Sequence, residues 1–107
     1  MKILVTGAGG FLGRHLTSAL DAAGFETRGL DLPSTSHHPR EGFIPCDLTD
    51  AASTRAALRG LRFDAVVHLA AASRTAPEAL AMRVAVEGTA NLLAALGGDF
   101  GGFVLAG

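Results

Sequence analysis

Near the start of the chain, residues 6–13 read TGAGGFLG, with glycine at positions 7, 9, 10 and 13. Before this stretch stands Ile3-Leu4-Val5, a short continuous apolar run typical of a strand buried on both faces of a parallel sheet. After it, apolar residues recur at positions 12, 16, 19, 20 and 23, which is helical spacing, and Gly24 is placed to end the helix. The sequence therefore predicts a strand, a tight glycine turn and a helix over 11–23.

Outward from this unit, strand and helix patterns keep alternating. We expect a strand over 25–32, a loop over 33–42 and a strand over 42–47 that Pro45 keeps short. A helix over 51–58, capped by Asp50, and a strand over 63–69 follow. Next come a helix over 77–96, with Pro77 in its first turn, and a strand that starts at 103. This order predicts an α/β fold. It is a Rossmann-type doubly wound parallel sheet with strand order 3-2-1-4-5, in a three-layer sandwich that is incomplete because it ends in the fifth strand.

Composition narrows the class of protein. The 107 residues carry a net charge of −1, so nothing in the charge favours nucleic acid or an anionic membrane as a partner. The single cysteine, Cys46, excludes an internal disulfide and a multi-cysteine zinc site. No signal peptide and no 18-residue apolar stretch is evident, so we expect one cytoplasmic domain without a membrane span. The chain has no tyrosine, and Lys2 is its single lysine.

The glycine stretch carries the first candidate site. Its spacing is G-x-x-G-x-x-G through Gly7, Gly10 and Gly13, because the third glycine of G-x-G-x-x-G would fall on Leu12. At a strand–turn–helix junction these glycines allow a tight turn, the approach of a diphosphate to the backbone, and close packing of helix on strand. The free amides and the dipole of the helix N-terminus then favour the diphosphate charge. The alternative is a turn that is merely flexible.

A carboxylate completes the pattern. Asp31 closes the second predicted strand, 18 residues after Gly13, where a carboxylate can accept hydrogen bonds from both hydroxyls of an adenosine ribose. A carboxylate there repels a 2′-phosphate, so we expect NAD as the cofactor in preference to NADP. Arg28 lies three residues before Asp31, which is too early in the sequence to reverse this preference. The alternative for Asp31 alone is a solvated strand end.

The ordered set of motifs resembles the extended short-chain dehydrogenase/reductases, which are the NAD-dependent epimerase/dehydratase proteins. The motifs are Thr6-Gly7-x-x-Gly10-x-x-Gly13, Asp47-Leu48, His68-Leu69-Ala70-Ala71 and Gly88-Thr89-x-Asn91-Leu92-Leu93. The resemblance covers the whole chain. It implies that Phe11 and Leu12 lie at the diphosphate, that Asp47 and Leu48 border the adenine, and that Leu69, Ala70 and Ala71 pass under the nicotinamide-side ribose.

The sequence departs from this family in places that bear on activity. Ala85 stands where the family often has a cofactor-binding asparagine, and Gly107 stands where the first catalytic serine is expected. The family's Tyr-x-x-x-Lys pair is absent. We therefore expect residues 1–107 to be the N-terminal NAD(P)-binding portion of a longer protein. Whether this chain is itself an enzyme stays open, and no residue in it is assigned a catalytic role.

By the same resemblance, the complete protein would move a hydride between NAD and a nucleotide-sugar or related alcohol, would bind that small-molecule substrate and could form a homodimer. The alternatives are a non-catalytic NAD(P)-binding module or sensor, and an inactive truncated fragment.

Other conspicuous residues have simpler interpretations. The adjacent His37 and His38 lack a third ligand nearby and are expected in a solvated loop, so no metal site is predicted. His68, at the end of a buried strand, is expected to be a hydrogen-bonded structural histidine. Cys46 is expected to be a small core residue, and Arg14 to be solvated.

Overall fold

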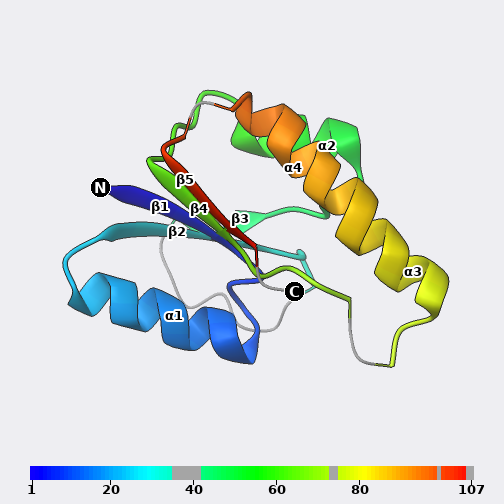
Figure 1. Cartoon of the computed structure of the whole chain (residues 1–107), viewed down its shortest axis with the longest axis horizontal. Helices are drawn as coiled ribbons and strands as arrows, with labels where there is room; N and C mark the ends of the chain where they lie inside the picture. The colour runs from blue at the N-terminus through cyan, green and yellow to red at the C-terminus, as the bar shows by residue number, and fades with distance from the viewer. Residues whose placement is uncertain (35–41, 73–74, 99, 106–107) are drawn as a thin grey trace.

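The fold is a five-stranded parallel sheet flanked by helices (Figure 1). It is seen in a computed structural model that describes residues 1–34, 42–72, 75–98 and 100–105. The strands are β1 (Lys2–Thr6), β2 (Glu26–Asp31), β3 (Ile44–Pro45), β4 (Ala65–His68) and β5 (Gly102–Leu105). Their order is β3-β2-β1-β4-β5 and every pair is parallel, which confirms the predicted topology.

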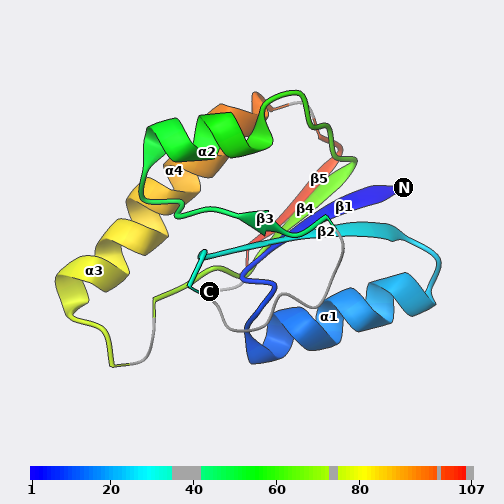
Figure 2. The same ribbon diagram turned by 180° about the vertical axis from the view of Figure 1, so that it is seen from behind.

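Helices cover both faces of the sheet. Helix α1 (Phe11–Ala22) lies on one face, and α2 (Ala51–Leu58) and α4 (Thr89–Leu96) lie on the other (Figures 1 and 2). This arrangement confirms the three-layer sandwich. The helix limits follow from local chemistry: the Asp50 carboxylate accepts the Ser53 amide at 3.1 Å as N-cap of α2, and Gly24 follows α1 with a positive φ of 92°.

The alternation of side chains along β1 explains why its apolar run is continuous. Ile3 and Val5 point toward α1 and pack with Leu16 and Leu20, whereas Leu4 belongs to the core cluster on the side of α2 and α4. All three β1 side chains are at most 5% exposed. Burial on both faces requires apolar residues at odd and even positions alike, as the sequence predicted.

The last long helix differs in detail from the expectation. Pro77 is its N-cap residue, one position before the helix, and the helix runs as α3 (Glu78–Met82), a π-helical segment η1 (Arg83–Gly88) and α4. It ends at Gly97, whose left-handed backbone (φ 67°) forms the C-cap. Strand β3 is only two residues long, because Pro45 has no amide hydrogen to extend the ladder.

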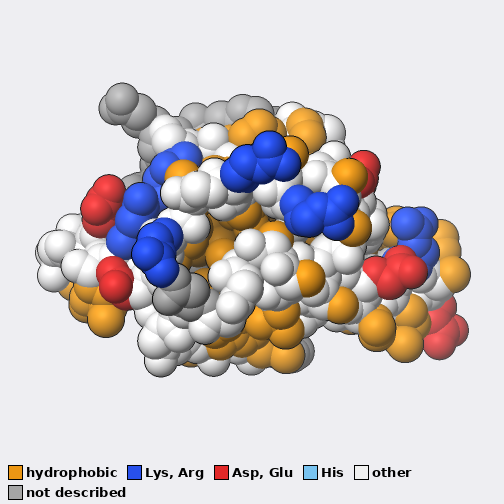
Figure 3. Space-filling view, turned by 90° about the horizontal axis from the view of Figure 1, so that it is seen from above, with side chains coloured by type: hydrophobic (Ala, Val, Ile, Leu, Met, Phe, Trp, Pro, Cys, Tyr) orange, Lys and Arg blue, Asp and Glu red, His pale blue; other side chains and the backbone are white. Residues whose placement is uncertain are grey.

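The same helix bears on the expectation that no segment could span a membrane. Residues Glu78–Leu96 form a 19-residue helix that is long and apolar enough to cross a membrane by length and composition only, and it carries an exposed Arg83–Glu87 ion pair. Several of its large apolar side chains are exposed: Leu80, Met82, Val86 and Leu93. Figure 3 shows hydrophobic side chains beside charged ones on the face of the molecule that carries α2 and α4. Length and composition alone do not establish a membrane span, so the expectation from sequence stays a prediction.

Two expectations fall outside the described residues. The histidine pair at 37–38 and position 107, where a serine was expected, are not described. Within the described ranges, no group of three or more His, Cys, Asp or Glu side chains is arranged to hold a metal ion.

Candidate functional site

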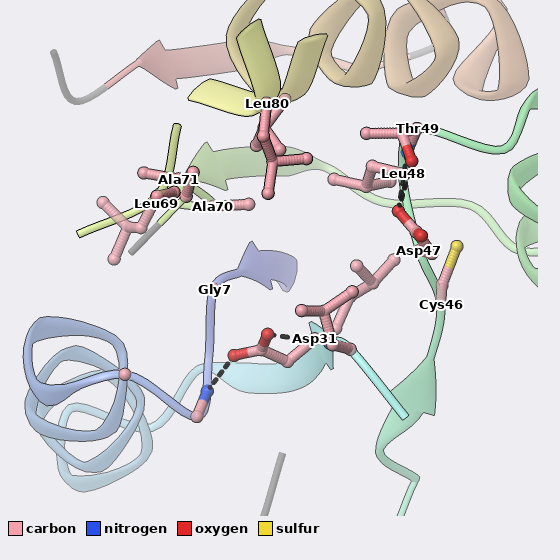
Figure 4. A pocket seen from close by; sticks show the side chains of 17 residues that line it. Gly7, Asp31, Cys46, Asp47, Leu48, Thr49, Leu69, Ala70, Ala71 and Leu80 are labelled. Carbon is pink, nitrogen blue, oxygen red and sulfur yellow. Dashed lines mark hydrogen bonds between the residues drawn. The ribbon is translucent and has the colours of Figure 1, made fainter. Parts of the chain in front are cut away.

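A cavity of about 610 Å³ opens at the carboxyl ends of the parallel strands (Figure 4). It lies at the point where chain connections diverge, with β2 on one side of β1 and β4 on the other, which is the usual ligand position in such sheets. Its walls come from the glycine turn, the ends of β2, β3 and β4, and the start of the long helix. The lining residues are Gly7, Gly9, Gly10, Leu30, Asp31, Leu32, Cys46, Asp47, Leu48, Thr49, Leu69, Ala70, Ala71, Ala72, Ala76, Leu80 and Val84.

The three glycines of the motif have different surroundings. Gly7 has φ 69°, and a Cβ on it would come within 2.8 Å of the Leu69 carbonyl carbon. A Cβ on Gly13 would overlap the Gly7 carbonyl oxygen, so this glycine lets α1 pack against the turn. A Cβ on Gly10 would meet a single atom within 4 Å, the Gly7 oxygen at 3.4 Å. Gly7 and Gly13 are thus required by the fold, whereas Gly10 keeps space open beside the cavity.

Asp31 is held against the glycine turn. Its Oδ2 accepts the Gly9 amide at 2.8 Å and its Oδ1 accepts the Leu32 amide at 2.7 Å (Figure 4). The carboxylate is therefore fixed at the end of β2, on the wall of the cavity. A carboxylate oxygen has lone pairs for more than one donor, so both oxygens can still accept hydroxyl hydrogens.

The segment after β3 forms the next wall. Asp47 Oδ1 accepts the backbone amide and the hydroxyl of Thr49, at 3.0 and 2.7 Å, and this bonding closes a tight turn (Figure 4). From the long helix, Asn91 Nδ2 donates to the Leu48 carbonyl at 2.8 Å. A Cβ on Gly88 would lie 3.5 Å from Leu48 Cβ, so the glycine brings the helix close to this segment. Gly88 and Asn91 of the Gly88-Thr89-x-Asn91 motif thus contact the segment at Leu48, about forty residues earlier in the sequence.

The wall beyond β4 rests on a buried polar chain. Thr6 and His68 are register partners in adjacent parallel strands, and Thr6 Oγ1 lies 2.6 Å from His68 Nδ1. On its other side, His68 Nε2 lies 2.8 Å from Thr89 Oγ1. The imidazole is 2% exposed, and burial lowers its pKa. His68 is therefore a buried, hydrogen-bonded structural histidine, as the sequence predicted.

Most of the predicted site residues meet around one cavity. Those that line it are Gly7, Gly10, Asp31, Asp47, Leu48, Leu69, Ala70 and Ala71. Gly13 lies behind the turn and does not line the cavity. Phe11 and Leu12 are 74% and 58% exposed at the start of α1 and are also absent from the lining, so the structure does not bring these two side chains to it.

Sequence reasoning missed one wall altogether. Ala76, Leu80 and Val84 line the cavity from the long helix and its approach, and Leu80 points into it (Figure 4). The four-residue spacing of Leu80 and Val84 is the signal that would have indicated a shared helix face. Ala85, at the position of the family's asparagine, is exposed and outside the lining; Val84 lines the cavity instead.

The remaining candidates behave as expected. Cys46 is 4% exposed, burial raises the pKa of its thiol, and its Sγ donates to Thr54 Oγ1 at 3.7 Å. It is a core residue at the edge of the cavity rather than a reactive thiol. Arg14 is exposed on α1.

The fold and the cavity at its switch point define a Rossmann-type α/β protein with a glycine-rich turn. The family model of the NAD dependent epimerase/dehydratase family matches residues 3–104, and the chain belongs to this family. Of the curated relatives, the UDP-glucose 4-epimerase of Lactobacillus helveticus is 35% identical over 77 residues, which are 68% of this chain and 23% of that protein. An uncharacterized Mycobacterium tuberculosis protein is 35% identical over 97 residues, 90% of this chain and 10% of its own length.

Solved structures show the same fold. The UDP-glucose 4-epimerase of Thermus thermophilus, in complex with NAD, matches with a TM-score of 0.78 and 34% identity, over 89% of this chain and 33% of that one. A putative epimerase from Burkholderia cenocepacia matches with a TM-score of 0.82 and 38% identity, over 97% of this chain and 36% of that one. The present chain therefore spans about a third of the length of these solved relatives.

Proposed function

We propose that residues 1–107 are an NAD-binding Rossmann domain, the N-terminal cofactor-binding portion of an epimerase/dehydratase-type oxidoreductase. The observation that carries this proposal is the pairing of an open glycine turn with a fixed carboxylate across one cavity. The residues fit the cofactor, because the space beside Gly10 is one that a side chain would fill and because Asp31 presents acceptors to ribose hydroxyls.

In this assignment each wall binds one part of the dinucleotide. The Gly7–Gly10 turn and the amides at the start of α1 bind the diphosphate. Asp31 binds the adenosine ribose, and Asp47 and Leu48 border the adenine. Leu69, Ala70 and Ala71 lie beneath the nicotinamide-side ribose, where the small side chains of Ala70 and Ala71 permit close approach. When bound, NAD supplies a carbon that accepts or gives up a hydride.

The chain's own residues bind and orient rather than transfer protons. It has no tyrosine, and Lys2 stands at the opposite end of β1 from the glycine turn, with its Nζ 5.6 Å from the Phe63 ring centre. We infer that acid–base chemistry on a nucleotide-sugar or related alcohol belongs to the complete protein. The two UDP-glucose 4-epimerases among the relatives support this substrate class. The absence of tyrosine equally favours a second candidate, a non-catalytic NAD-binding module.

Calorimetric titration with NAD⁺ tests the assignment. The wild-type chain should bind NAD⁺ at one site, and Gly10→Val should weaken that binding by about tenfold or more, because the valine occupies diphosphate space. Gly102→Val is the matched control, since a Cβ at Gly102 in β5 meets nothing within 4 Å. It should bind as the wild type does. Equal affinities for Gly10→Val and wild type would contradict the assignment.

A further inference from the structure

The buried chain Thr6–His68–Thr89 joins three elements directly behind the cavity. Thr6 ends β1, His68 ends β4 and Thr89 begins α4. The two side-chain contacts of the imidazole, 2.6 Å to Thr6 and 2.8 Å to Thr89, are both within hydrogen-bond distance. None of the three residues lines the cavity itself. The effect of these three side chains on a bound ligand therefore passes through the backbone that they hold.

Counting donors and acceptors fixes the tautomer of the histidine. Thr6 Oγ1 accepts the Leu69 amide at 3.1 Å and the Ala70 amide at 3.2 Å, and the Leu69 amide is shared with the Thr6 carbonyl oxygen at 3.2 Å. A hydroxyl has two acceptor lone pairs and one hydrogen, so the hydrogen of Thr6 is left to be donated to His68 Nδ1. That nitrogen carries no proton, and the ring proton therefore resides on Nε2, from which it is donated to Thr89 Oγ1.

The same hydroxyl holds a segment of the cavity wall. Leu69 and Ala70 both line the cavity, and both present their amides to Thr6 Oγ1. The Leu69–Ala70 peptide is also packed against Gly7, where a Cβ would lie 2.8–2.9 Å from the peptide carbon and nitrogen. The Thr6 hydroxyl is thus one of the groups that hold this peptide, beside the Thr6 carbonyl and Gly7, and the unprotonated Nδ1 of His68 sets the orientation of that hydroxyl.

We propose that His68, held as the Nε2–H tautomer between Thr6 and Thr89, is a positioning residue that sets the Leu69–Ala70 peptide for the nicotinamide-side half of the cofactor. This inference rests on the proposed NAD-binding function. The inference separates two parts of the ligand. ADP contains the adenosine diphosphate part of NAD⁺, which contacts other walls of the cavity in the proposed function. ADP binding should therefore not depend on the Thr6–His68–Thr89 hydrogen bonds.

Two measurements test the proposal. The first is two-bond ¹H–¹⁵N NMR of the wild-type chain, which reports which ring nitrogen of His68 carries the proton. The Nε2–H form is expected, and an Nδ1–H form would overturn the proposal. The second compares NAD⁺ and ADP affinities of Thr89→Val, which removes the acceptor for Nε2–H at similar size, with those of Thr89→Ser, which keeps a hydroxyl.

Thr89→Val should bind NAD⁺ about tenfold more weakly and ADP within about twofold of wild type, and Thr89→Ser should restore NAD⁺ binding. Equal losses for both ligands, or no loss for either, would overturn the positioning role. A wild-type chain that bound neither ligand would contradict the proposed function and the positioning role together, and the NMR spectrum would still decide the tautomer. Thermal melts of the variants show that each one is folded.

Discussion

At the scale of single residues, Asp31 has two roles that one substitution cannot separate. In the proposed function it presents a charge to the ribose, and in the structure it accepts the Gly9 amide, which fixes the glycine turn. We expect the wild-type chain to prefer NAD⁺ to NADP⁺, because the carboxylate repels a 2′-phosphate. Asp31→Asn keeps the shape of the side chain and removes its charge. It should reduce the ratio of NAD⁺ affinity to NADP⁺ affinity by about tenfold.

Asp31→Ala should weaken NAD⁺ binding as well, because the Gly9 amide loses its acceptor. Calorimetry of both variants with both dinucleotides checks these expectations. Tighter binding of NADP⁺ than of NAD⁺ by the unmodified chain would refute the role given to Asp31.

His68 makes the stability of the fold depend on pH. Its folded pKa lies below the ordinary value of 6.5 because the ring is buried, and Thr6, Thr89 and Phe103, which bond to or lie against it, are uncharged. The unfolded chain therefore binds a proton at a higher pH than the folded chain does. The stabilisation is complete above about pH 6.5 and is lost as the pH falls from there toward the folded pKa.

Urea unfolding at about pH 7.5 and 5.5 measures this effect. The wild type should lose more unfolding free energy between the two values than His68→Gln does, since glutamine does not titrate. The same pH dependence in both proteins would contradict the neutral histidine.

At the scale of elements, the sequence predicted the strands, α1 and α2 because their signals are local. Buried apolar runs, the Asp50 cap and Gly24 each act within a few residues. The π-helical turn of Arg83–Gly88 was missed, because a wider turn of six residues leaves no mark on the apolar spacing. The bond of Asn91 to Leu48 was missed because it spans 43 residues, and only the folded sheet brings its partners together.

That bond carries the prediction for the long helix. Asn91→Asp keeps the shape of the side chain and replaces the donor by an acceptor facing the Leu48 carbonyl. We expect it to lower the unfolding free energy by about 1–3 kcal/mol and to weaken the binding of NAD⁺ and ADP alike, since the proposed adenine site borders Leu48. Urea unfolding and calorimetry measure the two effects. A variant as stable as wild type would show that the helix does not support this loop.

At the scale of the whole molecule, the amino-acid composition limits the acid–base catalysis that residues 1–107 can carry out. General acid–base catalysis is worth about 10²–10⁴-fold, and this chain has no phenol and one distant lysine to supply it. We expect no turnover when the purified chain is mixed with NAD⁺ and UDP-glucose, followed by NADH absorbance and by separation of the sugar nucleotides. Sustained conversion would contradict the proposed division between cofactor binding by residues 1–107 and catalysis by the rest of the complete protein.

Exposed apolar surface sets the expected solution behaviour. Val104 and Leu105 on the edge strand β5 are 59% and 60% exposed, and the long helix exposes Met82 and Val86 to a similar extent. An unpaired apolar edge invites association. Sedimentation velocity over a range of concentrations should therefore show self-association, together with a low melting temperature. A monomer with a sharp transition at high temperature would contradict this expectation.

The central claim is that one cavity binds NAD⁺ through the glycine turn, the Asp31 carboxylate and the ends of β3 and β4. Backbone amide NMR during an NAD⁺ titration tests it most directly. The account predicts that the shifted amides cluster at Gly7–Gly10, Asp31–Leu32, Asp47–Leu48 and Leu69–Ala71. Saturating NAD⁺ that left these amides unmoved, or that shifted residues at the opposite end of the sheet around Arg62 and Phe100, would contradict it.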